Sequence, residues 1–265
     1  MAQDGVGPNG GSEIMDQINL NQDYENELRK AINESMPFIS DLQPLNLMQH
    51  EFGDSKFVKC FDALQQRYTQ IRRLRRDGNC FYRAFLYQIF EHFVLSGCGT
   101  DYNNFIKMLK ESKDDLVKEG GYDLIVIEDF FDCFLEEVEK LAKVEKSKAQ
   151  EHCLKVLSNH EQANYIIMYS RFMAATYLKK NAIMFEDFVG DVASFCQREV
   201  EQLDVECDQP QMIAITNYFG VGCEVNSVNA YNGAMDIINL PDDPSFQGFR
   251  ARLLFMPGHY DALYH

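Results

Sequence analysis

Several features are scarce or missing in this 265-residue sequence, and each absence excludes a class of protein. No apolar run approaches the roughly 18 residues of a membrane-spanning helix, so we expect no membrane segment. Basic residues are few: 25 Lys and Arg stand against 41 Asp and Glu, which gives a formal charge of −16 at pH 7. Such a surface repels polyanions, so neither nucleic acid nor an anionic membrane is expected as a partner.

Two further absences concern targeting and metal binding. No basic residue precedes Arg29, whereas signal and transit peptides carry positive charge near their start. We therefore expect an intracellular protein, placed in the cytoplasm with the nucleus as a second compartment. The eight cysteines include no C-x-x-C pair, so most should be free thiols packed as small apolar side chains. No metal and no cofactor is expected, and the chain should be a monomer.

The chain divides into three parts by composition. Residues 1–12 are polar and glycine-rich, which predicts a disordered leader. Residues 13–44 contain an amphipathic helix, predicted over 13–35, and a connector with two prolines. The apolar stripe of this helix is narrow, so the helix either packs loosely on its own domain or binds a partner. Residues 45–265 are predicted to form one folded domain.

The remaining pattern favours the α+β class, with a helical body followed by a small, mostly antiparallel sheet. Apolar residues at helical spacing come first, and short, turn-bounded, strand-like segments follow near the C-terminus. The predicted helices span 55–70, 80–96, 100–119, 127–141, 164–180, 192–200 and 212–219. The predicted strands span 222–228, 235–240, 250–256 and 260–264, and a short extended segment is expected over 71–76.

Cys80 has the most reactive predicted placement among the cysteines. It follows the turn-forming run Asp77-Gly78-Asn79 and opens a predicted helix. The positive end of a helix dipole can lower the pKa of a thiol there below about 8.5. Backbone N–H groups in such a glycine turn can also stabilise an oxyanion. The alternative interpretation is a buried structural cysteine.

A thiol nucleophile needs a base, and His259 is the best placed of six histidines. It follows Pro257-Gly258 and precedes Asp261 by two residues. Side chains at i and i+2 of a strand project from the same face, so Asp261 could orient the imidazole of His259. Together with Cys80 these residues have the composition of a Cys-His-Asp catalytic site.

These two segments carry a resemblance to a known family. The run Asp77-Gly78-Asn79-Cys80-Phe81-Tyr82-Arg83-Ala84 resembles the cysteine motif of ovarian-tumour (OTU) deubiquitinases, and Pro257-Gly258-His259-Tyr260-Asp261 resembles their histidine motif. The otubain branch fits best, because the N-terminal helical extension and the segments 71–73, 126–130, 164–166 and 199–201 are also similar. The resemblance spans about residues 45–265, which would then be an OTU catalytic domain.

The resemblance implies a papain-like cysteine protease fold and hydrolysis of isopeptide bonds in ubiquitin conjugates or polyubiquitin, with a preference for one lysine linkage. Cys80 would attack the carbonyl, His259 would act as base and then acid, and Asp261 would orient His259. The backbone N–H of Asp77 would shape the oxyanion loop, with that of Cys80 as second donor. The alternative function is a non-catalytic regulator that binds ubiquitin and inhibits ubiquitin-conjugating enzymes through the N-terminal helix. Another ubiquitin-like modifier also remains open as the substrate.

Some segments depart from the otubain pattern. Gln202-Leu203 and Asp208-Gln209 stand where otubains usually have Pro-Met and Asp-His, and 226–230 replaces a Tyr-Met-Asp-Arg run. Because these segments resemble ubiquitin-facing ones, the linkage preference cannot be transferred from the family.

Four arginines cluster just before the cysteine turn, at positions 72, 73, 75 and 76. One interpretation is a positive field beside the thiolate or a contact to an acidic segment of ubiquitin. The other is a set of solvated charges flanking a strand, which would contribute little.

Overall fold

The computed structural model describes residues 31, 35–52, 55–229 and 234–265. Residues 38–265 form one compact unit. The predicted leader and nearly all of the predicted helix over 13–35 lie outside the described residues. None of the described helices combines the length and apolar character that a membrane crossing requires.

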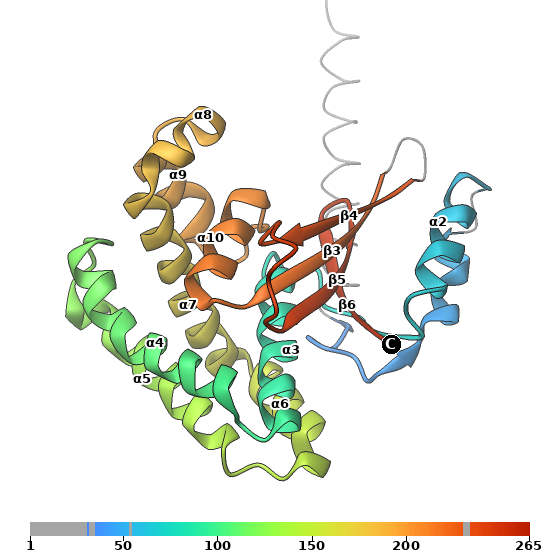
Figure 1. Ribbon diagram of the computed structural model, residues 1–265, viewed down its shortest axis with the longest axis horizontal. Coiled ribbons are helices and arrows are strands. Elements are labelled where there is room, and N and C mark those ends of the chain that lie inside the picture. Colours follow the sequence, from blue (N-terminus) through green and yellow to red (C-terminus); the bar gives the residue numbers. More distant parts are fainter. Residues whose placement is uncertain (1–30, 32–34, 53–54, 230–233) are drawn as a thin grey trace, which may run out of the picture. The chain divides into compact units, whose positions relative to one another are not determined.

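A helical body occupies the middle of the chain (Figure 1). The predicted helix over 80–96 is found residue for residue, and it ends at Gly97, whose φ of 80° is left-handed and suits glycine. The longer helices are α3 (Cys80–Ser96), α4 (Thr100–Lys118), α5 (Leu124–Leu141), α6 (Ala149–Leu157), α7 (His160–Lys180) and α10 (Gln209–Phe219). The short ones are η2 (Lys146–Lys148), η3 (Ala182–Met184), α8 (Glu186–Val189), α9 (Val192–Phe195) and the π-helical η4 (Cys196–Val200).

The structure corrects several predicted helix boundaries. The helix predicted over 55–70 is α2 (Ser55–Gln65), because the chain turns after Gln65 and Thr69 already donates its backbone N–H to Tyr264 of the sheet. Helix α5 begins three residues early, where the Asp123 side chain caps the N–H of Ile125. Helix α6 was not predicted, because its buried stripe is short and lies within a polar segment.

The strands form one sheet of six in the order β1-β2-β6-β5-β3-β4. Four of the five pairings are antiparallel and β3 with β5 is parallel, so the predicted α+β class with a mostly antiparallel sheet is confirmed. The strands are β1 (Gln43–Pro44), β2 (Gln70–Arg72), β3 (Gly222–Val228), β4 (Met235–Leu240), β5 (Arg250–Met256) and β6 (His259–Tyr264).

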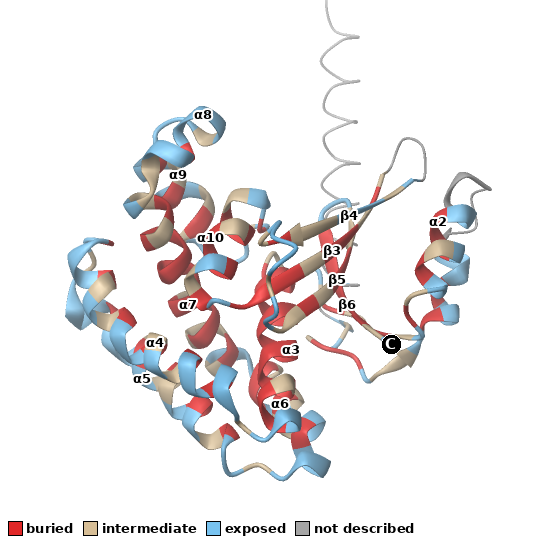
Figure 2. Cartoon of the chain, in the orientation of Figure 1, coloured by how far each residue is buried: buried red, intermediate tan, exposed pale blue. Residues whose placement is uncertain are grey.

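The sheet is covered on both faces (Figures 1 and 2). Helix α3, almost wholly buried, packs against β5 and β6 within the main core. The opposite face is covered by η1 (Leu45–Phe52) and α2 through a second cluster. That cluster contains Leu45, Met48, Phe61, Leu64 and Tyr68 against Val228, Leu254 and Leu263. Each fully buried apolar side chain contributes about 1.5–3 kcal/mol, so both layers hold the sheet in place.

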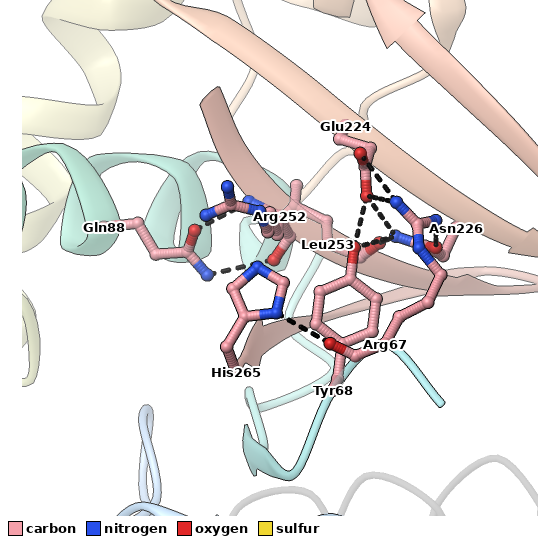
Figure 3. A network of polar contacts seen from close by, with 8 residues as sticks. All are labelled: Arg67, Tyr68, Gln88, Glu224, Asn226, Arg252, Leu253 and His265. Atoms are coloured by element: carbon pink, nitrogen blue, oxygen red, sulfur yellow. Dashed lines mark hydrogen bonds and ion pairs between the residues drawn. The ribbon is translucent and has the colours of Figure 1, made fainter. Parts of the chain in front are cut away.

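A polar network also fastens the second layer to β3 (Figure 3). The guanidinium of Arg67 donates to both carboxylate oxygens of Glu224 at 3.0 Å and to Asn226 at 2.9 Å. The Tyr68 hydroxyl donates to the same carboxylate, and the His265 ring stacks on Tyr68 with centroids 5.1 Å apart. The segment that follows α2, which belongs to the second cluster through Tyr68, is therefore anchored to the sheet by charge as well as by apolar packing.

Candidate active site

The turn before α3 is held by its own side chains. Asp77 accepts the backbone N–H of Asn79 at 2.9 Å through one carboxylate oxygen and the Arg83 guanidinium at 2.8 Å through the other. Arg83 is fully buried and also donates to the Leu157 carbonyl of α6 at 2.8 Å. Cys80 follows as the first residue of α3, as the sequence predicts, in a position defined by this turn.

Position 78 requires glycine for two reasons, its backbone conformation and the closeness of a neighbouring segment. Its φ of +74° is left-handed, and a Cβ atom at this position would lie 2.2 Å from backbone atoms of Asp204. The segment around Asp204 therefore packs directly onto the backbone of the cysteine turn. No side chain could be accommodated there without displacing one backbone from the other.

Replacing Gly78 by alanine is expected to lower both stability and turnover. The added methyl group must push the cysteine turn away from Asp204, and strain at a left-handed residue alone costs about 1 kcal/mol or more. Thermal unfolding and kcat on a ubiquitin substrate measure the two effects. The matched control is Gly121→Ala, since Gly121 has a similar φ of +74° and open space around it. Equal effects of both substitutions on kcat would contradict the role of the close approach.

Arg171 connects the cysteine turn to the segment 200–205, and sequence reasoning missed it. It is fully buried in α7 and donates to Gly78 O at 3.0 Å, to Asn79 Oδ1 at 2.8 Å and to Val205 O at 2.7 Å. Asn79 in turn donates to Asp204 at 2.8 Å. A charged residue that is buried inside an apolar helix must be paired. The presence of an arginine within this apolar stretch was therefore the sequence signal that could have identified Arg171.

His259 and Asp261 come together at the start of β6, as predicted from their spacing. His259 Nε2 lies 2.8 Å from Asp261 Oδ1, and both side chains are 1% exposed. The same oxygen accepts the backbone N–H of Leu74 at 2.8 Å, and Arg73 Nε lies 3.0 Å from Asp261 Oδ2. His259 Nδ1 is buried and makes no hydrogen bond within the described residues. This nitrogen is the one left to act on a thiol.

Cys80 is packed against the same strand. Burial raises the pKa of the Cys80 thiol to about 12, although backbone hydrogen bonds from Tyr260 and Phe81 favour the thiolate. The prediction of a lowered pKa is therefore wrong for this structure, because desolvation and the nearby charges of Asp77 and Asp261 outweigh the helix end. At neutral pH the resting thiol keeps its proton, so attack requires a base.

A cavity of about 530 Å³ opens over Cys80. Gly258 and Tyr260 line it beside the cysteine, and the segment 205–208 lines another wall. Phe188 of α8, at 82% exposure, stands at its border. All eight cysteines are free, as predicted for most of them. Among the described residues no group of three or more His, Cys, Asp or Glu is arranged to hold a metal ion.

The role of Asp77 stays a prediction, and part of the arginine interpretation is wrong. The backbone N–H of Asp77, predicted to shape the oxyanion loop, donates to the Arg75 carbonyl at 3.0 Å within the same turn. The interpretation of the arginine cluster as solvated charges is wrong for Arg72, which is 1% exposed and lies 4.9 Å from the centre of the Tyr87 ring. It is also wrong for Arg73, whose charge faces Asp261.

The sequence profile of the family described as Peptidase C65 Otubain matches residues 31–265. The chain belongs to this otubain family. Ubiquitin thioesterase OTUB1 of Homo sapiens is 29% identical over 91% of this chain and 88% of its own length. The OVARIAN TUMOR DOMAIN-containing deubiquitinating enzyme 1 of Arabidopsis thaliana is 29% identical over 86% and 81%.

Solved structures of otubains are similar to this chain over nearly its whole length. A complex of ceOTUB1 with ubiquitin aldehyde and UBC13~Ub matches with a TM-score of 0.78 and 26% identity, covering 90% of this chain and 97% of that one. A complex of h/ceOTUB1 with ubiquitin aldehyde and UBCH5B~Ub matches with a TM-score of 0.78 and 26% identity over 95% and 98%. The OTU-type fold expected from the two motifs is thereby confirmed.

Proposed function

We propose that this otubain is a thiol-dependent deubiquitinase that hydrolyses isopeptide bonds of ubiquitin conjugates or polyubiquitin through Cys80, His259 and Asp261. One observation carries the proposal: the buried His259–Asp261 pair flanks Tyr260, whose backbone hydrogen-bonds the Cys80 thiol, and both Cys80 and Tyr260 line one cavity. The named thioesterase and deubiquitinase activities of its relatives agree with this chemistry.

The reaction uses the chain's own groups in two halves. His259 Nδ1 takes the thiol proton as Cys80 Sγ forms a bond to the isopeptide carbonyl carbon, while Asp261 holds the other ring nitrogen. The carbon–nitrogen bond then breaks, and His259 returns the proton to the leaving lysine amine. Water, deprotonated by His259, attacks the thioester, which releases the ubiquitin carboxylate and regenerates the Cys80 thiol.

A second candidate function is binding of ubiquitin-charged conjugating enzymes, which would restrain them without cleavage. Similar structures contain OTUB1 together with UBC13~Ub or UBCH5B~Ub, and this favours the same class of partner for this chain. The N-terminal helix predicted to make that contact lies outside the described residues. Binding of this kind does not need the thiol, so it can coexist with hydrolysis.

Cys80→Ser separates the two functions. Serine keeps the size of the side chain but is a far weaker nucleophile, so diubiquitin cleavage should fall below detection across a panel of defined linkages. Affinity for diubiquitin and for a ubiquitin-charged conjugating enzyme, measured by calorimetry, should stay within about twofold of the parent protein because packing is preserved. The control is Cys98→Ser, a partly buried cysteine after α3. Undiminished cleavage by Cys80→Ser would show that Cys80 is not the nucleophile. If the parent protein cleaved none of the defined linkages, the proposed deubiquitinase activity would be refuted.

A further inference from the structure

Asp261 is paired with the guanidinium of Arg73, a charged group that has no part in the Cys80–His259–Asp261 scheme. Arg73 Nε lies 3.0 Å from Asp261 Oδ2, the oxygen that His259 leaves open, while Oδ1 receives His259 and the N–H of Leu74. Asp261 is 1% exposed. A carboxylate this deeply buried is costly without a charged partner, and the ion pair with Arg73 supplies one. The hydrogen bonds to Oδ1 and the charge beside Oδ2 together favour one orientation of the carboxylate.

Arg73 is itself fixed from the second layer. Its guanidinium makes a two-pronged contact with the carboxylate of Glu51 in η1, one arm of which is 3.2 Å long. Its backbone N–H donates to Ser40 Oγ at 2.8 Å. The Arg73 side chain is 19% exposed, so solvent reaches only its margin. The guanidinium therefore cannot turn away from Asp261 without giving up Glu51 as well.

Arg73 and Leu74 belong to the same stretch of chain that leads through the turn into Cys80. The residues that hold Asp261 and the residue that attacks are thus joined by a short covalent path. We propose that Arg73 is a positioning residue of the hydrolysis: by clamping Asp261 from the segment that carries Cys80, it keeps His259 aligned with the thiol. The assay of this inference rests on the proposed function, but the geometry does not.

The proposal differs from the two simpler interpretations of a buried arginine. A residue that only stabilises the fold would lower the melting temperature and leave kcat of the folded protein unchanged. A residue that contacts ubiquitin would raise KM. Substituting a positioning residue lowers kcat at constant KM. The same substitution has little effect once Asp261 has itself been replaced, because the carboxylate that Arg73 positions is then gone.

The test compares Arg73→Gln, which removes the charge, with Arg73→Lys, which retains it, on a mono-ubiquitin fluorogenic substrate. We expect Arg73→Gln to lower kcat by about tenfold or more, as the loss of a charged contact to a buried group does, with KM within about twofold. Arg73→Lys should recover most of kcat. In an Asp261→Asn background, Arg73→Gln should lower kcat by less than about twofold, because coupled residues are not additive.

Arg67→Gln is the matched control, because it breaks the other arginine–glutamate pair that fastens the second layer to the sheet. It should lower the melting temperature and leave kcat unchanged. An equal loss of kcat in Arg67→Gln, full additivity of Arg73→Gln with Asp261→Asn, or a rise in KM alone would each overturn the proposal. If Arg73→Gln does not fold, Arg73→Lys decides. Because the proposal assigns the clamping of Asp261 to the charge of Arg73, a folded Arg73→Lys protein that keeps this charge but has a strongly reduced kcat would overturn it.

Alkylation of Cys80 by iodoacetamide, followed by mass spectrometry of its peptide, gives a readout that needs no ubiquitin. The rate should fall in Arg73→Gln and stay unchanged in Arg67→Gln. An unchanged rate in both variants would count against positioning. If the parent protein cleaves no ubiquitin substrate, the proposed function fails while this arm still reports whether Arg73 acts on the thiol through Asp261.

Discussion

His259→Ala is expected to lower kcat/KM on a mono-ubiquitin substrate by about 10⁴-fold or more, since it removes the imidazole that takes the thiol proton. Burial holds the pKa of Cys80 at about 12, so at neutral pH almost no thiolate exists before a base acts. His259 Nδ1 is buried and makes no hydrogen bond within the described residues, so it is the ring nitrogen available for that transfer. Steady-state hydrolysis at pH 7.5, with circular dichroism to confirm folding, measures the loss.

Asp261→Asn should cost about 10- to 100-fold less than His259→Ala, because it loosens the orientation of the imidazole without removing it. Two other histidines serve as controls. His92 stacks on Phe249 and pairs with Asp101 at 3.3 Å, and His160 begins α7 at the surface. Substituting either by asparagine should leave kcat/KM within about twofold, as surface changes usually do. A loss at His92 or His160 as large as that at His259 would show that the base was misassigned.

Arg171→Met is expected to lower both the free energy of unfolding and the turnover. Removing a fully buried charge that bonds three backbone carbonyls and the Asn79 side chain leaves those groups without donors, at a cost of about 3 kcal/mol. The cysteine turn would also lose its link to the segment 200–205. Urea unfolding gives the free energy, and kcat of the folded fraction reports the turn.

Lys180→Met is the control for Arg171→Met, because Lys180 lies on the same helix and makes an exposed ion pair with Asp115 at 3.0 Å. Such pairs contribute about 0–1 kcal/mol, so unfolding should change little and kcat should not change. If Arg171→Met destabilised the protein but left kcat intact, the arginine would support only the fold.

Local signals were enough to predict the elements that carry the reactive groups. The turn at Gly78, the apolar run after Cys80 and the glycine at its end define α3, and the short turn-bounded segments near the C-terminus define the strands. The i and i+2 spacing of His259 and Asp261 correctly placed both on one face. These features depend on neighbours in sequence, which is why the pattern sufficed.

The partners that fix the site depend on tertiary contacts and could not be predicted in the same way. Arg73 finds Asp261 only because β2 pairs with β6, and nothing near Arg73 in sequence indicates that pairing. The pKa of Cys80 rises because distant segments exclude water from the thiol, which outweighs the local helix end. Helix α6 forms from a polar segment because a short stripe around Cys153 is buried against α3 and α7.

The most direct test of the central claim is labelling with ubiquitin that carries a thiol-reactive electrophile at its C-terminus, followed by peptide mapping of all eight cysteines. We expect a single adduct on Cys80, lost in Cys80→Ser and strongly slowed in His259→Ala. An adduct centred on another cysteine, such as Cys196 or Cys223, or a Cys80 adduct that forms at the parent rate without His259, would contradict it.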